Sequence, residues 1–147
     1  MWLGLYKGQK TLFVGSPKIT FMELDNAVHT NSDIEQIYFR AGKCAKINSR
    51  VLSMFIKKYK GFFLITVEVS ISKMYCLTKD IIRNITLILT INKNDILMLK
   101  NMSVENIHVK LQGLKGNQNV TIMTKGVENI NINDLQEKIY KGKNVIL

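Results

Sequence analysis

The sequence contains one proline, two cysteines and two histidines in 147 residues. Because it also has no Pro-, Gly- or Ser-rich stretch, an extended linker or a low-complexity chain is excluded. Two cysteines cannot form the disulfide framework of a small secreted domain, so we expect reduced thiols. No run approaches the roughly 20 apolar residues of a transmembrane helix, and no membrane span is predicted. Residues 1–6 lead directly to Lys7 without a basic leader or a cleavage site, which predicts synthesis in the cytoplasm without a signal peptide.

Apolar residues are plentiful, at 46% of the chain. This fraction is typical of a chain that buries a core, and the length is close to that of one ordinary domain. No change of composition marks a boundary. The sequence therefore predicts a single β-rich domain over residues 1–147.

Alternating apolar and polar residues are the main structural signal. Residues 63–71 place apolar side chains at every odd position and Thr66, Glu68 and Ser70 between them, as expected of a strand with one buried and one wet face. Residues 85–91 repeat the pattern, but Ile88 falls on the polar side, which indicates cover on both faces. Further strands are predicted over residues 2–6, 11–14, 19–24, 34–39, 96–99, 104–111, 120–124 and 127–132.

Turn residues suggest how these strands pair. Residues 2–6 and 11–14 flank a Lys-Gly-Gln-Lys turn, and residues 92–95 separate 85–91 from 96–99, so both are interpreted as hairpins. A match between residues 104–107 and 127–130 is too short to indicate a repeat architecture. The predicted fold class is mainly β, an antiparallel β-sandwich or small barrel with one or two short helices; an α+β fold is the alternative.

Residues 48–59 depart from the strand pattern. Val51, Leu52, Phe55 and Tyr59 fall near helical spacing, and Gly61 follows as a terminator, which favours a helix capped by residue 48 or 49. A shorter helix is predicted to begin at residue 133 or 134 and to stop before residue 142.

Positive charge is the compositional feature that bears on function. The net charge is +10, and no acidic residue lies between Glu35 and Glu68. Seven cations occupy this interval: Arg40, Lys43, Lys46, Arg50, Lys57, Lys58 and Lys60. Such a basic segment attracts polyanions through counterion release, so it is a candidate contact for nucleic acid. The alternative, which we favour, is a solvated surface that pairs with an acidic protein partner.

Reaction chemistry has little support in the sequence. Glu23 with Asp25, and Asp33 with Glu35, form two i, i+2 acidic pairs around His29. On strands each pair would share a face, as a divalent-metal site or an acid and base pair requires. We favour the interpretation that these carboxylates decorate a polar loop that faces a basic neighbour, and a metal-dependent hydrolase remains a remote option. His29, Cys44, Cys76 and His108 lack the close spacing of structural zinc ligands.

Aromatic residues near the amino end have two possible interpretations. Trp2, Tyr6 and Phe13 could form an exposed contact surface, but aromatic residues on a first hairpin more often belong to the core, which is the reading we favour.

The sequence therefore predicts a non-enzymatic structural or interaction subunit of a larger assembly, with no cofactor and no catalytic or metal site. Its partners would be other protein subunits, in a homo-oligomer or a multi-chain complex. A bacteriophage virion protein of the tail, baseplate or capsid is one such class. The alternative is a nucleic-acid-binding domain that uses the basic segment of residues 40–60.

Overall fold

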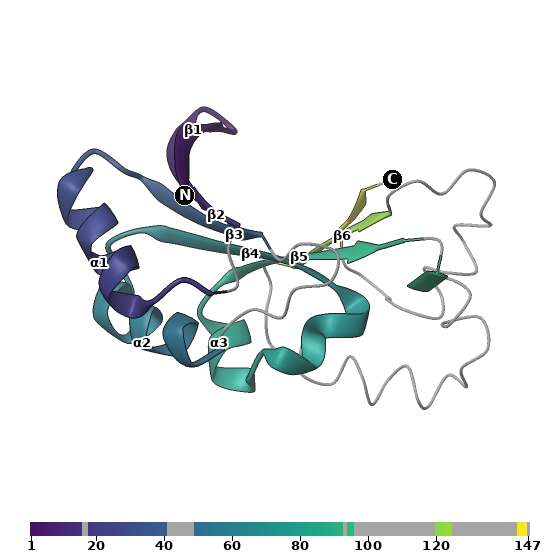
Figure 1. Ribbon diagram of the computed structural model, residues 1–147. Helices are drawn as coiled ribbons and strands as arrows, with labels where there is room; N and C mark the ends of the chain where they lie inside the picture. Colours follow the sequence, from purple (N-terminus) through teal and green to yellow (C-terminus); the bar gives the residue numbers. More distant parts are fainter. Residues whose placement is uncertain (16–17, 41–48, 93, 96–119, 125–143, 147) are drawn as a thin grey trace.

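The structure, a computed structural model, describes residues 1–15, 18–40, 49–92, 94–95, 120–124 and 144–146. Its helices and strands follow one another along the chain (Figure 1). Their bounds are β1 (Trp2–Tyr6), β2 (Gln9–Val14), α1 (Phe21–Thr30), β3 (Gln36–Arg40), α2 (Ser49–Tyr59), β4 (Leu64–Ser70), the 3₁₀ helix η1 (Ile71–Cys76), α3 (Lys79–Arg83), β5 (Thr86–Ile91), β6 (Val120–Thr124) and β7 (Asn144–Ile146).

The strands form one sheet whose spatial order is the order of the chain, from β1 to β7. Only β1 and β2 pair antiparallel, and every later neighbour is parallel. Parallel neighbours need a crossover connection, and α1 lies between β2 and β3, α2 between β3 and β4, and η1 with α3 between β4 and β5. Figure 1 shows α1, α2 and α3 on the same side of the sheet, with the β1–β2 hairpin rising on the opposite side.

This topology corrects the predicted fold class. The chain is rich in strands, as predicted, but it builds one sheet covered by helices on one face, so the α+β alternative is nearer to the structure than a sandwich or barrel. Among the described strands, antiparallel pairing was wrong beyond the first hairpin. Between β2 and β5 its physical cause is the helical crossovers, which return the chain to the same end of the sheet before β3, β4 and β5.

The first hairpin is confirmed. Lys7 and Gly8 form its two-residue turn with φ of 51° and 78°, the positive values that match the twist of a tight hairpin. The turn sets the register, in which Tyr6 faces Gln9, Gly4 faces Thr11 and Trp2 faces Phe13. The strands predicted over residues 34–39 and 120–124 are also present as β3 and β6.

The strand predicted over residues 19–24 is wrong, because α1 begins at Phe21. The Thr20 hydroxyl accepts a hydrogen bond from the backbone N–H of Glu23 at 3.2 Å and lies 3.1 Å from the Glu23 carboxylate. This is a capping arrangement that starts a helix. Leu24 and Val28 then share the buried side of α1, four residues apart as helical spacing requires.

Helix α2 confirms the prediction for residues 48–59. Val51, Leu52, Phe55, Ile56 and Tyr59 form its buried side. Gly61, with φ of 90°, follows its end, in the left-handed conformation that favours glycine after a helix. Helices η1 and α3 were not predicted, and the Thr78 hydroxyl caps α3 by accepting from Ile81 N–H at 3.2 Å.

The core lies between the helices and the sheet. Alternate residues of β2 to β5 point to this side and are at most 5% exposed. They are Leu12, Val14, Ile37, Phe39, Ile65, Val67, Val69, Leu87, Leu89 and Ile91. Phe39 of β3 meets Phe55 of α2 edge to face at 5.9 Å between ring centroids, so aromatic contact fixes the helix layer to the sheet.

We name the opposite side of the sheet the distal face. The prediction that this face of β4 is exposed to water is wrong. Thr66 and Glu68, expected to be wet, are only 2% and 6% exposed. Gln36 bridges Thr11 and Thr66 with hydrogen bonds of 3.1 and 3.3 Å, so these polar side chains can be buried at little cost. Strand β5 is interior, as predicted, and pairs in parallel with β4 and β6.

Several predictions fall outside the described residues. These are the hairpin return over residues 96–99, the strands over residues 104–111 and 127–132, and the helix from residue 133 or 134.

Candidate interaction surface

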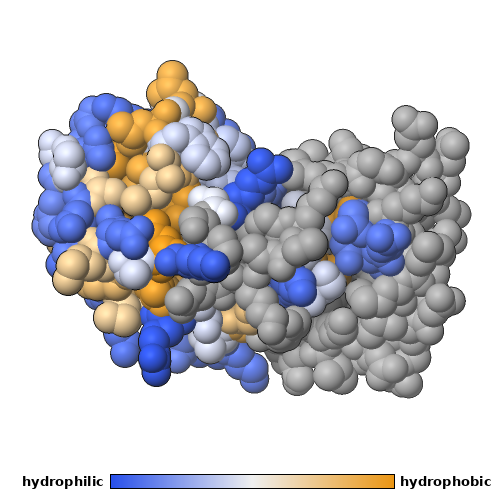
Figure 2. All heavy atoms as spheres, viewed as in Figure 1, coloured by the Kyte–Doolittle hydropathy of each residue, from blue (hydrophilic) through white to orange (hydrophobic). Residues whose placement is uncertain are grey.

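Exposed apolar side chains concentrate on the first strand. Eight large apolar side chains of the described residues are exposed, and four of them occupy the amino end. These four are Met1, Trp2, Leu3 and Leu5, with 50%, 53%, 44% and 77% of their surface exposed. We name this set the apolar edge. Figure 2 shows apolar atoms gathered at the top of the view, over the hairpin that Figure 1 draws there.

The apolar edge coincides with one edge of the sheet formed by the described strands. β1 is the first strand of the sheet, and β2 is its only neighbour among the described strands. Proteins usually protect such an edge with charged residues, proline or a bulge. Trp2–Tyr6 has no charged residue and no proline, and its register with β2 is unbroken. The edge is therefore suited to pairing with another chain.

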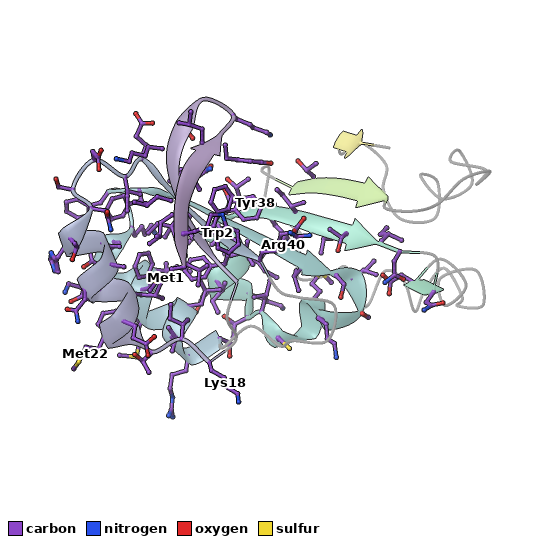
Figure 3. The ribbon with its side chains drawn as sticks, turned by 45° about the horizontal axis from the view of Figure 1, so that its top comes forward. Met1, Trp2, Lys18, Met22, Tyr38 and Arg40 are labelled. Atoms are coloured by element: carbon purple, nitrogen blue, oxygen red, sulfur yellow. The ribbon has the colours of Figure 1, made fainter. Side chains whose placement is uncertain are left out.

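Aromatic rings make this hairpin stiff. Trp2 stacks on Phe13 with 5.3 Å between centroids and 8° between ring planes. Tyr38 of β3 joins the group, at 5.0 Å from Tyr6 and 5.6 Å from Phe13, and Figure 3 shows Trp2 and Tyr38 near each other by the hairpin. Gly4 leaves the room for this packing, since a Cβ there would lie 3.1 Å from the Phe13 ring.

The favoured prediction that these aromatic residues belong to the core is wrong, and the alternative of an exposed contact surface fits Trp2 alone. Tyr6 and Phe13 are partly buried and Trp2 is 53% exposed, and none of the three belongs to the core cluster. The cluster is thus a rigid support that holds one face of Trp2 and leaves the rest of the indole accessible. A preformed aromatic surface loses little conformational entropy when a partner binds.

An ion pair lies next to the aromatic cluster on the distal face. Arg40 Nε is 3.0 Å from Glu68 Oε2, with side chains 59% and 8% exposed. Burial raises the pKa of the Tyr38 hydroxyl, and the nearby charge of Glu68 raises it further. Tyr38 therefore stays neutral, and it donates or accepts hydrogen bonds without acting as a base.

The acidic residues around His29 do not form the arrangement that a strand would give. Glu23 and Asp25 lie on α1, where residues two apart do not face each other. Asp25 instead accepts hydrogen bonds from Lys58 Nζ at 2.7 Å and from the Tyr59 hydroxyl, and His29 Nε2 lies 3.7 Å away. Asp25 thus ties α1 to α2.

The pKa values of this cluster follow its hydrogen bonds. The bond from Lys58, and then that from Tyr59, lowers the pKa of Asp25, while Asp25 raises the pKa of Lys58. Burial, and then the bond to Asp25, raises the pKa of Tyr59. All three shifts favour a fixed ionic clamp between two helices, with Asp25 ionised and Tyr59 neutral, over proton transfer at neutral pH.

The second acidic pair holds the loop before β3. Asp33 pairs with Lys10 Nζ, whose hydrogen bond lowers the pKa of Asp33. Glu35 accepts from the backbone N–H of Lys10 at 3.0 Å. Both carboxylates are therefore engaged by strand β2.

Metal ligation has no geometric support in the part of the chain that the structure describes. There, no three His, Cys, Asp or Glu side chains are placed to hold one ion. His29 lies beside Asp25, and Cys76 is a free thiol. Cys44 and His108 fall outside the described residues.

The basic segment is divided by the sheet. Arg40 lies on the distal face with Glu68, whereas α2 packs against the other face through Phe39. The remaining cations are Arg50, Lys57 and Lys58 on α2 and Lys60 after it, while Lys43 and Lys46 lie outside the described residues. Lys58 is held by Asp25 and lies 5.8 Å from the Phe21 ring, which leaves Arg50, Lys57 and Lys60 exposed on the helix side.

Sequence reasoning missed the leucines of the apolar edge. Leu3 and Leu5 alternate with Trp2, Gly4 and Tyr6, so the strand has no polar face at all. An uncharged strand at the start of a sheet is a recognisable signal of an unprotected edge. The position of the strand in the sheet, which a sequence pattern does not supply, was the missing information.

Comparison of the chain with protein-family models, with curated proteins and with solved structures finds no match. None of the helices in the described residues has the length and apolar character needed to cross a membrane.

Proposed function

We propose that this protein is a non-enzymatic interaction subunit that joins a larger assembly by pairing the apolar edge with another polypeptide chain. The observation that carries the proposal is the exposure of Leu5, at 77%, on an uncharged strand that is the first of its sheet. Burial of such a strand against a partner removes apolar surface from water and satisfies its free backbone groups at the same time.

The rigid support of this strand favours the same function. Trp2 is held on Phe13, and Tyr6 on Tyr38, so the hairpin presents a fixed shape. The carboxylates Asp25 and Asp33 are engaged in ion pairs within the chain, which favours a binding role over acid and base chemistry. A bacteriophage particle, in its tail, baseplate or capsid, is one example of such an assembly.

Trp2 gives a direct test because it is the only tryptophan of the chain. Its fluorescence in the isolated dilute protein should be quenched by acrylamide, as its 53% exposure requires. In the native assembly, or with any purified partner, the emission should shift to shorter wavelength and quenching should fall. Unchanged quenching of Trp2 in the assembled protein would contradict the proposal.

A second candidate function is binding of a polyanion by α2. It is favoured by the exposure of Arg50, Lys57 and Lys60, together with the net charge of +10. Binding of duplex and single-stranded nucleic acid should then weaken steeply with salt and be lost when Arg50, Lys57 and Lys60 are changed to Glu, which leaves the Lys58–Asp25 pair intact. Weak binding that the three changes leave unaltered would exclude this candidate.

A further inference from the structure

We infer that the partner of the apolar edge is a second copy of this chain, paired with β1 in antiparallel orientation about a two-fold axis at Gly4. This inference rests on the proposed function, since it identifies the chain that the edge binds. The observation behind it is the order of residues in β1, which is Trp-Leu-Gly-Leu-Tyr. Read from either end, it is aromatic, leucine, glycine, leucine, aromatic.

A two-fold interface must be complementary to itself, because the same patch lies on both sides. In an antiparallel pair centred on Gly4, Trp2 lies opposite Tyr6 of the second copy, Leu3 opposite Leu5, and Gly4 opposite Gly4. Each of these pairs joins side chains of one kind on one face of the joined sheet. β1 thus has the residue pattern that such an interface requires.

The two faces of the strand would gain different contacts. Trp2 and Tyr6 lie on the face of Phe13 and Tyr38, so the two aromatic clusters would become continuous across the axis. Leu3 and Leu5 point to the other face, where 44% and 77% of their surface is exposed. Four leucines from the two copies would cover one another there.

The backbone is also suited to this pairing. In an antiparallel ladder, alternate residues direct N–H and C=O groups to each side. The two-residue turn after Tyr6 therefore leaves the groups of Leu3 and Leu5 directed to the free edge. Gly4 would then fall at a close pair, where Cα atoms approach to about 4.5 Å, and the absence of a side chain removes any clash on the axis.

Charge explains why the contact would be made here. Each copy carries a net charge of +10, so two copies repel. Trp2–Tyr6 contributes no charge to the contact. Lys7 follows the strand at each end of the pair, and the repulsion that remains is screened by salt, so dimerisation should strengthen as salt increases. Binding of a polyanion would show the opposite dependence.

The size of the contact sets the expected affinity. A contact made by one strand from each copy lies at the lower end of specific interfaces, at about 1,200 Å² of total buried surface or less. We therefore expect a dimer with a micromolar dissociation constant.

Sedimentation velocity of the full chain between about 1 and 200 µM tests the inference. The wild type should pass from monomer to dimer, and Leu5→Lys should weaken the dimer by about tenfold or more, because it places a charge opposite Leu3 of the second copy. Phe62→Lys is the matched control, since Phe62 is 76% exposed but lies outside β1. It should dimerise like the wild type. Circular dichroism should show both variants folded.

Disulfide trapping tests the register. In a Cys44→Ser, Cys76→Ser background, a mixture of Leu3→Cys and Leu5→Cys chains should cross-link, whereas either variant alone should not.

Cross-linking of Leu3→Cys with itself, or a dimer that Leu5→Lys leaves intact, would overturn the inference. A wild type that stays monomeric would overturn it as well. If the wild type stays monomeric but Trp2 becomes protected in the native assembly, only the identity of the partner is wrong; if Trp2 stays accessible there too, the proposed function fails with it.

Discussion

Replacement of Phe55 by alanine should be among the most damaging changes in the chain. Phe55 is 0% exposed, and its ring contacts Phe39 at 5.9 Å and Tyr59 at 4.7 Å between centroids. Removal of a buried phenylalanine ring costs about 3–5 kcal/mol. Each aromatic pair contributes about 0.5–1.5 kcal/mol beyond burial. We therefore expect Phe55→Ala to lower the free energy of unfolding by about 4–5 kcal/mol.

Urea denaturation followed by circular dichroism measures this loss. With a slope of about 2 kcal/mol/M, the midpoint should fall by about 2 M. Phe62→Ala is the control, because Phe62 lies three residues after Tyr59 but is 76% exposed, and its effect should stay within about 0.5 kcal/mol. A loss below about 1.5 kcal/mol at Phe55, or equal losses in the two variants, would refute the packing of α2 on β3.

Three further predictions concern other parts of the structure. Thr20→Ala should lower the free energy of unfolding by about 0.5–2 kcal/mol in a urea titration, because α1 loses its cap; no loss would mean that the cap does not form. Because the folded pKa of Asp25 is lowered from 3.8, its stabilising effect should be complete above that pH and lost as pH falls through the folded value. The urea midpoints of wild type and Asp25→Asn should therefore converge in acid, and a constant gap would contradict the clamp. Gly4→Ala should displace the Phe13 ring and change Trp2 emission, whereas Gly15→Ala, whose Cβ would meet Trp2 at an ordinary 3.5 Å, should not. Equal spectra of the two variants would argue against the stacked pair.

The elements that local signals determine could be predicted from the sequence. The Lys-Gly-Gln-Lys signal and the helical spacing of Val51 to Tyr59 were sufficient for the first hairpin and for α2, although the turn is shorter than predicted because β2 already begins at Gln9. Helix α1 was missed although its signal was present. Thr20 and Glu23 have the spacing of a capping box, but the β-branched and aromatic residues around them, from Ile19 to Phe21, favoured a strand.

The pairing of the strands could not be predicted from alternation. Thr66 and Glu68 resembled a wet face, but Gln36 and Arg40 of the neighbouring strand satisfy them in the interior. A polar residue that faces water and one that is hydrogen-bonded to the next strand have the same pattern in the sequence. The distinction depends on which strand lies alongside, and the crossover helices determine that.

The candidate site was predictable only in part. Trp2 was considered as a contact residue, although the core was favoured, and Leu3 and Leu5 were not considered, since their exposure depends on β1 being the first strand of the sheet. The basic segment seemed continuous in the sequence, whereas the sheet separates Arg40 from the cations of α2. Cations that belong to one segment of the sequence therefore lie on opposite sides of the sheet.

Amide hydrogen exchange at Leu3 and Leu5 tests the central claim most directly. In the dilute protein these amides, directed to the free edge, should exchange quickly, and they should become protected as the protein concentration rises or in the native assembly. The amide of Phe62, which donates to Tyr59 O at 3.0 Å, should show no such dependence. Exchange at Leu3 and Leu5 that stays equally fast in the dilute, concentrated and assembled protein would show that the apolar edge binds nothing.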